Sequence, residues 1–150
     1  MSDLRPDAVG VVVLRGEGEP TRVLLLRRGR GAFAGAWTIV MGGVEVGEAA
    51  TDTARREVRE ETGLAVTELF TAGELDTFYD PVRDRVVVVP FFVAQVEAGE
   101  VRTDEAHDAY RWVTFAEADE LLTFTSQRRL LPEVQRAFVA QRPEPWRLIR

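Results

Sequence analysis

The sequence predicts an α/β fold in which helices pack against a mixed β-sheet. Two observations lead to this prediction: apolar runs of strand length recur along the chain, and helical patterns are inserted between them and follow them. With 150 residues, 45% of them apolar, the chain has the size of one common domain and can fill a hydrophobic core. Because no repeat or linker interrupts it, we expect residues 1–150 to form a single domain.

The first elements are predicted to be two strands joined by a turn. Residues 8–14 and 22–26 are rich in valine and leucine, and glycine and proline residues lie between them. A basic, glycine-rich loop follows at 27–35, after which residues 37–41 are expected to form a short strand. The chain therefore begins with a predicted hairpin and a loop that leads to a third strand.

A helix is predicted in the middle of the chain, followed by two more strands. The helix is expected from about residue 49 to 62, and Gly63 stands where a left-handed C-terminal cap usually lies. Strands are expected at 65–73 and 85–96, separated by a turn-rich stretch at 80–84. Because the second of these strands is almost continuously apolar, we expect the pair to line the centre of the sheet.

The C-terminal part is predicted to be mainly helical. A short strand is expected at 110–113, and helices are expected at 115–122 and 126–141. The second of these helices carries apolar residues at helical spacing, so one of its sides should pack against the sheet. The tail from 142 to 150 gives no clear pattern and receives no prediction.

Composition excludes several function classes. A net charge of −6 argues against a protein that holds long nucleic acid, because such binding needs a basic surface. The chain has no cysteine, so thiol catalysis, disulfides and zinc–thiolate sites are excluded. Its apolar runs are too short to span a bilayer and its first residues lack a signal core, so we expect a cytoplasmic protein without a membrane partner.

The predicted central helix places acidic side chains on an unusual face. At about 100° of rotation per residue, Glu57 and Glu61 fall on the same side as Ala50 and Ala54, whereas the arginines of the helix point away. An amphipathic helix normally keeps its acids on the solvated side, because burying an unpaired carboxylate is unfavourable. We therefore expect a positive partner against this face, although a solvated acidic run is the common alternative.

Glu60 completes a group of three carboxylates at spacings i, i+3 and i+4. Such a group repels itself and offers only hard oxygen donors, which are the ligands that Mg²⁺ or Mn²⁺ prefers. A divalent cation therefore fits this helix better than a basic side chain. A partly open site would also allow the cation to contact phosphate oxygens of a substrate.

The residues around the helix extend this pattern into a longer motif. This motif consists of nine residues at fixed spacing: Gly42, Glu48, Arg56, Glu57, Val58, Glu60, Glu61, Gly63 and Leu64. This segment, 42–64, resembles the Nudix box of the Nudix, or MutT-like, family of hydrolases. The resemblance implies an α/β/α sandwich with a mixed sheet, a divalent metal at the glutamates, and hydrolysis of a nucleoside diphosphate linked to another moiety.

The resemblance also implies roles for individual residues. Glu57 and Glu61 would be metal ligands, Glu60 a further ligand or a group that holds a metal-bound water, and Gly42 would supply a backbone carbonyl. Arg56 would orient a glutamate, although a surface pair with Glu60 is an alternative. The catalytic set is therefore Glu57, Glu60 and Arg56. The general base is expected to be Glu57 or Glu60, with a third possibility in Glu105.

Residues outside the box favour one branch of the family. The segment from Trp37 to Gly42 lacks the Pro-Gly-Gly of many members and resembles dATP and dihydroneopterin triphosphate pyrophosphohydrolases. The segment from His107 to Trp112 resembles the same branch and diadenosine polyphosphate hydrolases. In those relatives a glutamate directly precedes the histidine, whereas Ala106 stands there in this chain. We leave His107 out of the catalytic set, because a lone histidine more often has a structural place.

The expected partner is a small nucleotide or pterin triphosphate. The alternatives are a dinucleoside polyphosphate, a nucleoside diphosphate sugar, or a domain that binds nucleotides without turnover. Arginines at 27, 28 and 30 could hold distal phosphates, but a solvated loop explains them equally well. A homodimer is a further possibility that the sequence does not decide.

Overall fold

The computed structural model describes residues 3–18 and 20–150. In these residues one mixed sheet has the strand order β3-β2-β1-β6-β5-β8, with β4 paired to β1 and β7 paired to β2. The strands are β1 (Ala8–Arg15), β2 (Arg22–Arg28), β3 (Trp37–Thr38), β4 (Val40–Gly43), β5 (Val66–Asp80), β6 (Arg85–Val96), β7 (His107–Val113) and β8 (Leu148–Ile149). The helices are α1 (Ala50–Thr62), α2 (Phe115–Leu121), α3 (Thr125–Phe138) and the short 3₁₀ helix η1 (Pro145–Arg147).

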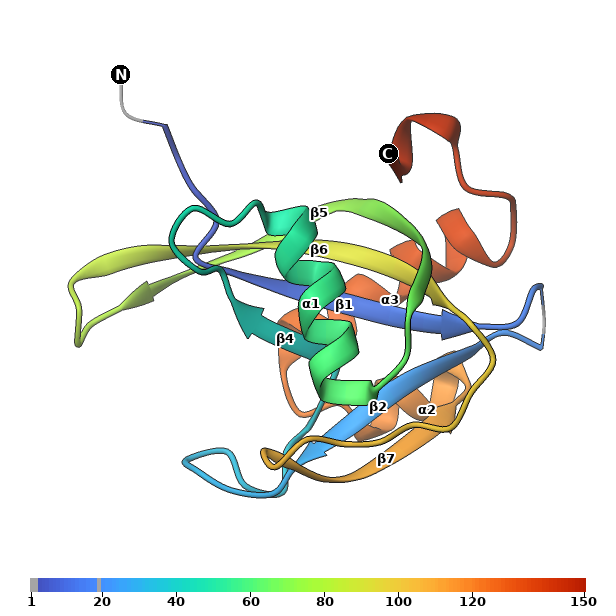
Figure 1. The fold of residues 1–150 in the computed structure, drawn as a ribbon, viewed down its shortest axis with the longest axis horizontal. Helices are drawn as coiled ribbons and strands as arrows, with labels where there is room; N and C mark the ends of the chain where they lie inside the picture. The colour runs from blue at the N-terminus through green and yellow to red at the C-terminus, as the bar shows by residue number, and fades with distance from the viewer. Residues whose placement is uncertain (1–2, 19) are drawn as a thin grey trace.

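Helices cover both faces of the sheet. Helix α1 lies on one face and α2 and α3 lie on the other (Figure 1). Strand β1 contributes to both layers: Val11 and Val13 pack with Ala54 and Val58 of α1, whereas Val12 packs with residues of α2 and α3. A strand that is covered on both faces is almost continuously apolar, as β1 is from Ala8 to Leu14. The predicted α/β/α sandwich with a mixed sheet is confirmed.

Strand β1 organises the sheet because it pairs in both directions. It runs parallel to β6, with Gly10 opposite Phe91, and antiparallel to β2 and β4. Its pairing with β4 places Val9 opposite Gly42, so the start of the box lies beside the N-terminal half of the central strand. Helix α1 then packs directly over β1 and β4. This arrangement fixes the box helix against the two strands that lead into it.

Helix α1 begins and ends close to the predicted bounds. Ala54 and Val58 are fully buried on its inner side, as the helical periodicity predicted. Gly63 adopts the left-handed conformation, with φ 74°, and its N–H donates to the Arg59 carbonyl. A residue with a Cβ is strained in this conformation, so glycine suits the C-terminal cap.

Several predicted bounds need correction. The strand predicted at 37–41 is broken at Ile39, whose N–H donates to the Gln127 side chain instead of a neighbouring strand. The strand predicted at 110–113 begins earlier, at His107, and α3 ends at Phe138 instead of 141. The unassigned tail forms η1 and then β8, which pairs with β5.

The prediction that β5 and β6 line the sheet centre is wrong for their outer part. Strand β5 continues past 73 to Asp80. After an irregularity between Thr71 and Leu75 it pairs with β6 again, from Leu75 opposite Pro90 to Asp80 opposite Arg85. This part projects from the body of the molecule as a two-stranded ribbon, which we call the β5–β6 ribbon, residues 75–88 (Figure 1). Its large exposed apolar side chains are Leu75, Phe78, Tyr79, Val82 and Val86.

Within the described residues, 3–18 and 20–150, no helix is long and apolar enough to cross a membrane.

Candidate active site

The inner side of α1 buries two of the three predicted carboxylates to different degrees. Glu61 is 3% exposed and Glu57 is mostly buried, while the Glu60 side chain is 55% exposed. Glu57 and Glu61 therefore lie on the inward face, as the periodicity predicted, and Glu60 lies at its edge. The arginines at 55 and 59 are exposed on the opposite side.

Arg56 joins the carboxylates of the box. Its Nε and Nη2 donate to the two carboxylate oxygens of Glu48 at 2.8 and 2.9 Å, which is a bidentate pair. Its Nη1 donates to Glu57 at 2.8 Å and to Glu60 at 3.2 Å, and its Nη2 also donates to the Gly43 carbonyl. Arg56 thus contacts Glu57 and also makes the pair with Glu60 that was the alternative, while its orienting role stays a prediction.

Glu48 anchors Arg56 from the loop before α1. Besides Arg56, its carboxylate accepts hydrogen bonds from the Thr53 hydroxyl and from the Glu45 N–H. Hydrogen bonds from Arg56, and then from Thr53, lower the pKa of Glu48 to about 2. The neighbouring carboxylates raise the pKa of Arg56 above its already high usual value. Both groups therefore keep their charges across the physiological range.

Gly42 leaves the space that the Glu57 side chain fills. A Cβ at position 42 would lie 2.1 Å from Cδ of Glu57 and 2.3 Å from its Cγ. No real side chain tolerates such distances, so any larger residue would move Glu57. The glycine of the box therefore has a steric reason that the sequence did not reveal, beside the carbonyl role that the resemblance implied.

Glu61 lies in a pocket of titratable groups. The Nε2 atom of His107 lies 3.4 Å from Glu61 Oε1, and the Glu61 Oε2 atom is buried without a hydrogen-bond partner among the described residues. Burial, followed by the nearby charge of Glu57, raises the pKa of Glu61 to about 10, while Arg28 has a weaker opposing effect. Glu61 is thus a buried carboxyl whose charge the protein alone does not compensate.

Two residues near Glu61 were not assigned to the box site from the sequence. His107 was left out of the catalytic set, yet the structure places its buried ring against Glu61 and Asp104. Arg28 was expected in a loop but ends β2, and its Nε is buried without a partner among the described residues. The pairing of Arg28 with His107 in neighbouring strands brings the two together.

Glu105, the third candidate base, lies away from this group. Its side chain is 92% exposed, and its contact is with Arg30 at 3.9 Å. Arg27 of β2 donates to Asp108 of β7 at 2.7 Å, which adds a side-chain contact to the pairing of these strands. These two arginines are therefore engaged with carboxylates of the protein, and the structure does not bring Glu105 together with the box glutamates.

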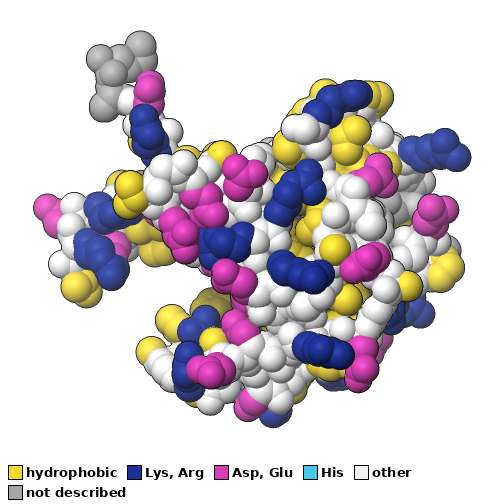
Figure 2. Space-filling model, in the orientation of Figure 1, with side chains coloured by type: hydrophobic (Ala, Val, Ile, Leu, Met, Phe, Trp, Pro, Cys, Tyr) yellow, Lys and Arg dark blue, Asp and Glu magenta, His cyan; other side chains and the backbone are white. Residues whose placement is uncertain are grey.

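Glu48, Glu57 and Glu60 point at Arg56, whereas Glu61 faces His107, so the box carboxylates do not share a common centre. Among residues 3–18 and 20–150, no three His, Cys, Asp or Glu side chains converge in a geometry that would hold a metal ion. The donor chemistry nevertheless fits a divalent cation, because Glu61 keeps one buried oxygen without a partner and Glu57 and Glu60 add further oxygen donors. Figure 2 shows acidic side chains on the face that carries α1, beside a hollow below the β5–β6 ribbon.

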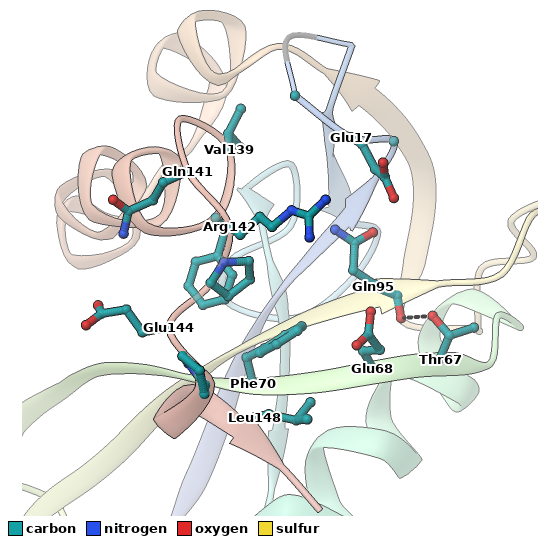
Figure 3. A pocket seen from close by; sticks show the side chains of 15 residues that line it. Glu17, Thr67, Glu68, Phe70, Gln95, Val139, Gln141, Arg142, Glu144 and Leu148 are labelled. Atoms are coloured by element: carbon teal, nitrogen blue, oxygen red, sulfur yellow. Dashed lines mark hydrogen bonds between the residues drawn. The ribbon is translucent and has the colours of Figure 1, made fainter.

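A second hollow contains none of these groups. A cavity of about 910 Å³ lies between the turn after β1, the start of β5 and the C-terminal tail, and no box residue lines it. Figure 3 shows Arg142 extending toward Gln95 across this cavity, with Phe70 at its floor and Glu17 and Glu68 at its sides. The cavity is therefore distinct from the candidate site.

Similarity to known proteins was found over most of the chain. It is 34% identical to an octanoyltransferase of Myxococcus xanthus over 128 residues, which are 80% of this chain but 34% of that protein. It is 34% identical to the asymmetrical bis(5'-nucleosyl)-tetraphosphatase of Mus musculus over 100 residues, 65% of this chain and 68% of that protein. It is 36% identical to the nucleoside triphosphatase NudI of Escherichia coli K12 over 92 residues, 56% of this chain and 65% of that protein. The chain thus spans between about a third and two thirds of the length of these relatives.

Solved structures extend the similarity to the fold. The MutT NUDIX hydrolase of Burkholderia pseudomallei is 27% identical, with a TM-score of 0.68 over 87% of this chain and 99% of that one. The dihydroneopterin triphosphate pyrophosphohydrolase of E. coli is 25% identical, with a TM-score of 0.66 over 91% of this chain and 96% of that one. Residues 4–134 match the family described as the NUDIX domain. The resemblance recognised in the box is confirmed, and this chain belongs to the NUDIX domain family of hydrolases.

Proposed function

We propose that this chain is a divalent-cation-dependent pyrophosphohydrolase that cleaves a diphosphate linkage of a nucleoside triphosphate-like substrate. The observation that carries the proposal is Glu61, a buried carboxyl beside Glu57 with one oxygen that has no partner in the described residues. A fold selected for stability alone would disfavour such a group, because an uncompensated buried charge is costly. A bound cation would provide the missing compensation.

The proposed roles follow from where each side chain lies. Glu57 and Glu61 are the proposed ligands on the inward face, with Glu60 at its edge and the Gly42 carbonyl as a backbone contribution. Arg56 holds Glu57 and Glu60 in place, since it donates to both. Mg²⁺ or Mn²⁺, when bound, would neutralise the charge that develops on phosphate oxygens and on the leaving group.

The general base is proposed to be Glu60 or Glu57. In the reaction, a water oxygen forms a bond to phosphorus while the bridging P–O bond breaks, and the base accepts a proton from the water. Glu60 is the more exposed of the two, so water and substrate can reach it more easily. Glu105 is the weaker candidate, because its side chain is exposed to solvent and contacts Arg30 instead of the box carboxylates.

Arg56 acts as an internal counter-ion for the box. Its guanidinium neutralises Glu57 and Glu60, which would otherwise repel each other and Glu61. Arg56 therefore reduces the repulsion within the group of carboxylates that is proposed to receive the cation.

Two substrate classes have support from the relatives. A nucleoside or pterin triphosphate is favoured by the E. coli pyrophosphohydrolase structure and by NudI. A dinucleoside polyphosphate is the second candidate, because the mouse tetraphosphatase is 34% identical over 100 residues.

The single domain over 1–150 is also proposed. The pairing of β8 with β5 supports it, because this pairing joins the C-terminal tail to the sheet.

The first experiment is a hydrolysis assay with the purified chain. Phosphate release, with added pyrophosphatase, is measured for nucleoside triphosphates, dihydroneopterin triphosphate, dinucleoside polyphosphates and nucleotide sugars, each with Mg²⁺, with Mn²⁺ and with EDTA. We expect turnover of one class that EDTA abolishes. Turnover that persists in EDTA would contradict the metal requirement, and nucleotide binding without any turnover would contradict the enzyme and favour a binding domain.

A further inference from the structure

A chain of three buried or partly buried side chains extends the site away from the box. The His107 side chain is 4% exposed and lies between two carboxylates. Its Nδ1 lies 2.6 Å from Asp104 Oδ1, and its Nε2 lies 3.4 Å from Glu61 Oε1. Strand β7 begins at His107, and Asp104 belongs to the loop before it, so the pair comes from a segment some 40 residues after α1 in the chain.

The short contact with Asp104 determines how the ring is held. Both ring nitrogens of His107 face carboxylate oxygens, so a ring that carries a hydrogen on each nitrogen donates to Asp104 through Nδ1 and toward Glu61 through Nε2. The bond to Asp104 fixes the plane of the ring and directs Nε2 at Glu61. Backbone contacts fix the loop as well, because the His107 N–H donates to the Asp104 carbonyl and the Gly29 N–H donates to the Ala106 carbonyl.

We propose that His107, oriented by Asp104, is a positioning residue that holds the Glu61 carboxylate in the orientation required for cation binding. His107 contacts only one oxygen of Glu61 and leaves the other, Oε2, without a partner. This division of the two oxygens is what a ligand requires: one atom is held by the protein and the other is available. The proposal rests on the proposed function, because it assigns a partner to one of its ligands.

A purely structural role explains these contacts less well. A buried histidine that only fills space needs no second carboxylate at Nε2, and a stabilising ion pair would satisfy both oxygens of Glu61. Partners that hold metal ligands in position commonly change metal affinity by about 10–100-fold when they are removed. The expected effect of losing His107 is therefore on cation affinity and much less on the reaction at saturating cation.

The test measures Mn²⁺ binding to the substrate-free protein by titration calorimetry, for the wild type and for His107→Leu, His107→Gln and Asp104→Ala. We expect His107→Leu and Asp104→Ala to weaken Mn²⁺ binding by about 10–100-fold. His107→Gln should recover part of the affinity, because its amide can still donate toward Glu61. In turnover assays, the Mn²⁺ concentration for half-activation should rise by a similar factor while kcat at saturating Mn²⁺ changes less.

The control is Val134→Ala. This substitution leaves a cavity in the core on the other side of the sheet, so it lowers the stability of the fold without a contact to Glu61. It should leave Mn²⁺ affinity unchanged. Wild-type Mn²⁺ affinity in His107→Leu and in Asp104→Ala would overturn the positioning role while leaving the proposed function intact. If the wild type itself binds no divalent cation, the proposed function fails and the positioning role fails with it. Should His107→Leu not fold, His107→Gln and Asp104→Ala still decide.

Discussion

Two buried charged side chains, Glu61 and Arg147, have opposite electrostatic surroundings. Arg147 is 4% exposed, and its Nη1 donates to the buried Ala72 carbonyl at 2.8 Å. Its guanidinium also lies over the rings of Trp146 and Phe138, at 4.5 and 5.5 Å from their centroids. Glu133 and Glu144 each lie within 3.5 Å of it, so opposite charge surrounds it although its Nε makes no hydrogen bond.

Glu61 has the reverse surroundings. Its neighbours include two further carboxylates, Glu57 and Asp104, and both raise its pKa. One of its oxygens has no partner in the described part of the chain. The comparison teaches that burial of a charge does not by itself reveal its purpose: a charge surrounded by opposite charge stabilises the fold, whereas a charge beside like charges indicates a site for a ligand of opposite charge.

The largest expected effect comes from Glu61→Gln. Turnover should fall by about 10²–10⁴-fold, because a ligand charge is lost while the shape is kept. In EDTA at pH 7 the free energy of unfolding should not fall. The reason is that the folded-state pKa of about 10 lies above the unfolded value, so ionisation of Glu61 costs stability as the pH rises, and glutamine removes this cost.

Kinetic assays and chemical denaturation of the same preparations check both parts of this expectation. Glu100→Gln serves as the matched control, because it removes an exposed carboxylate that lies outside the box. A Glu61→Gln variant that turns over like the wild type, or that is clearly less stable, would place Glu61 with Arg147 as a structural charge.

Gly42→Ala tests whether space beside Glu57 is part of the site. The added methyl group would overlap the Glu57 side chain and displace it. Because a displacement of about 1 Å in a catalytic group can cost about 100-fold in rate, we expect a loss of that order. Gly43→Ala is the control, since nothing lies within 4 Å of a Cβ there. Equal activity of the two variants would show that the position of Glu57 does not matter.

Arg147→Met should change stability and leave turnover unchanged. The substitution keeps much of the apolar stem but leaves the buried Ala72 carbonyl without its donor, which costs about 1–3 kcal/mol. Urea denaturation measures the loss, and kcat/KM of the same sample measures the activity. A variant of wild-type stability would mean that the partners around Arg147 do not stabilise the fold, which would remove one side of the comparison.

The smallest expected effect concerns Glu48 at acidic pH. Its pKa of about 2 lies below the usual 4.5, so its pairing with Arg56 stabilises the fold above pH 4.5 and is lost as the pH falls toward 2. In Glu48→Gln this contribution is absent, and the unfolding midpoint should depend less steeply on pH between 5 and 3. Thermal melts in EDTA across this range measure the slope. Identical slopes in the two proteins would show that the pair has no such role.

The sequence predicted the parts of the molecule that local patterns specify. The bounds of β6 agree with the prediction because apolar residues fill the strand and turn residues flank it, and α1 ends at Gly63 as predicted. The orientation of Glu57 and Glu61 followed from helical rotation alone. The identity of the box followed from nine positions at fixed spacing, and the family match agrees with it.

Contacts between distant segments could not be predicted in the same way. His107 reaches Glu61 only because β7 pairs with β2, and no local pattern encodes this approach. The outer half of β5 mixes charged and apolar residues, so it resembled a loop, whereas its pairing with β6 makes it a strand. Arg28 was interpreted by its charge as a loop residue, yet the pairing of β2 with β7 determines its place.

The β5–β6 ribbon has a consequence for how the protein opens. Its outer part has no layer of core beneath it, and its attachment at the base includes Asp7, which pairs with Arg85 and exchanges backbone and side-chain hydrogen bonds with Val88. A two-stranded segment of this kind is marginally stable by itself. Its amide protons should therefore exchange with solvent through local fraying at a small fraction of the global unfolding free energy, while α1 and the strands beneath it stay closed.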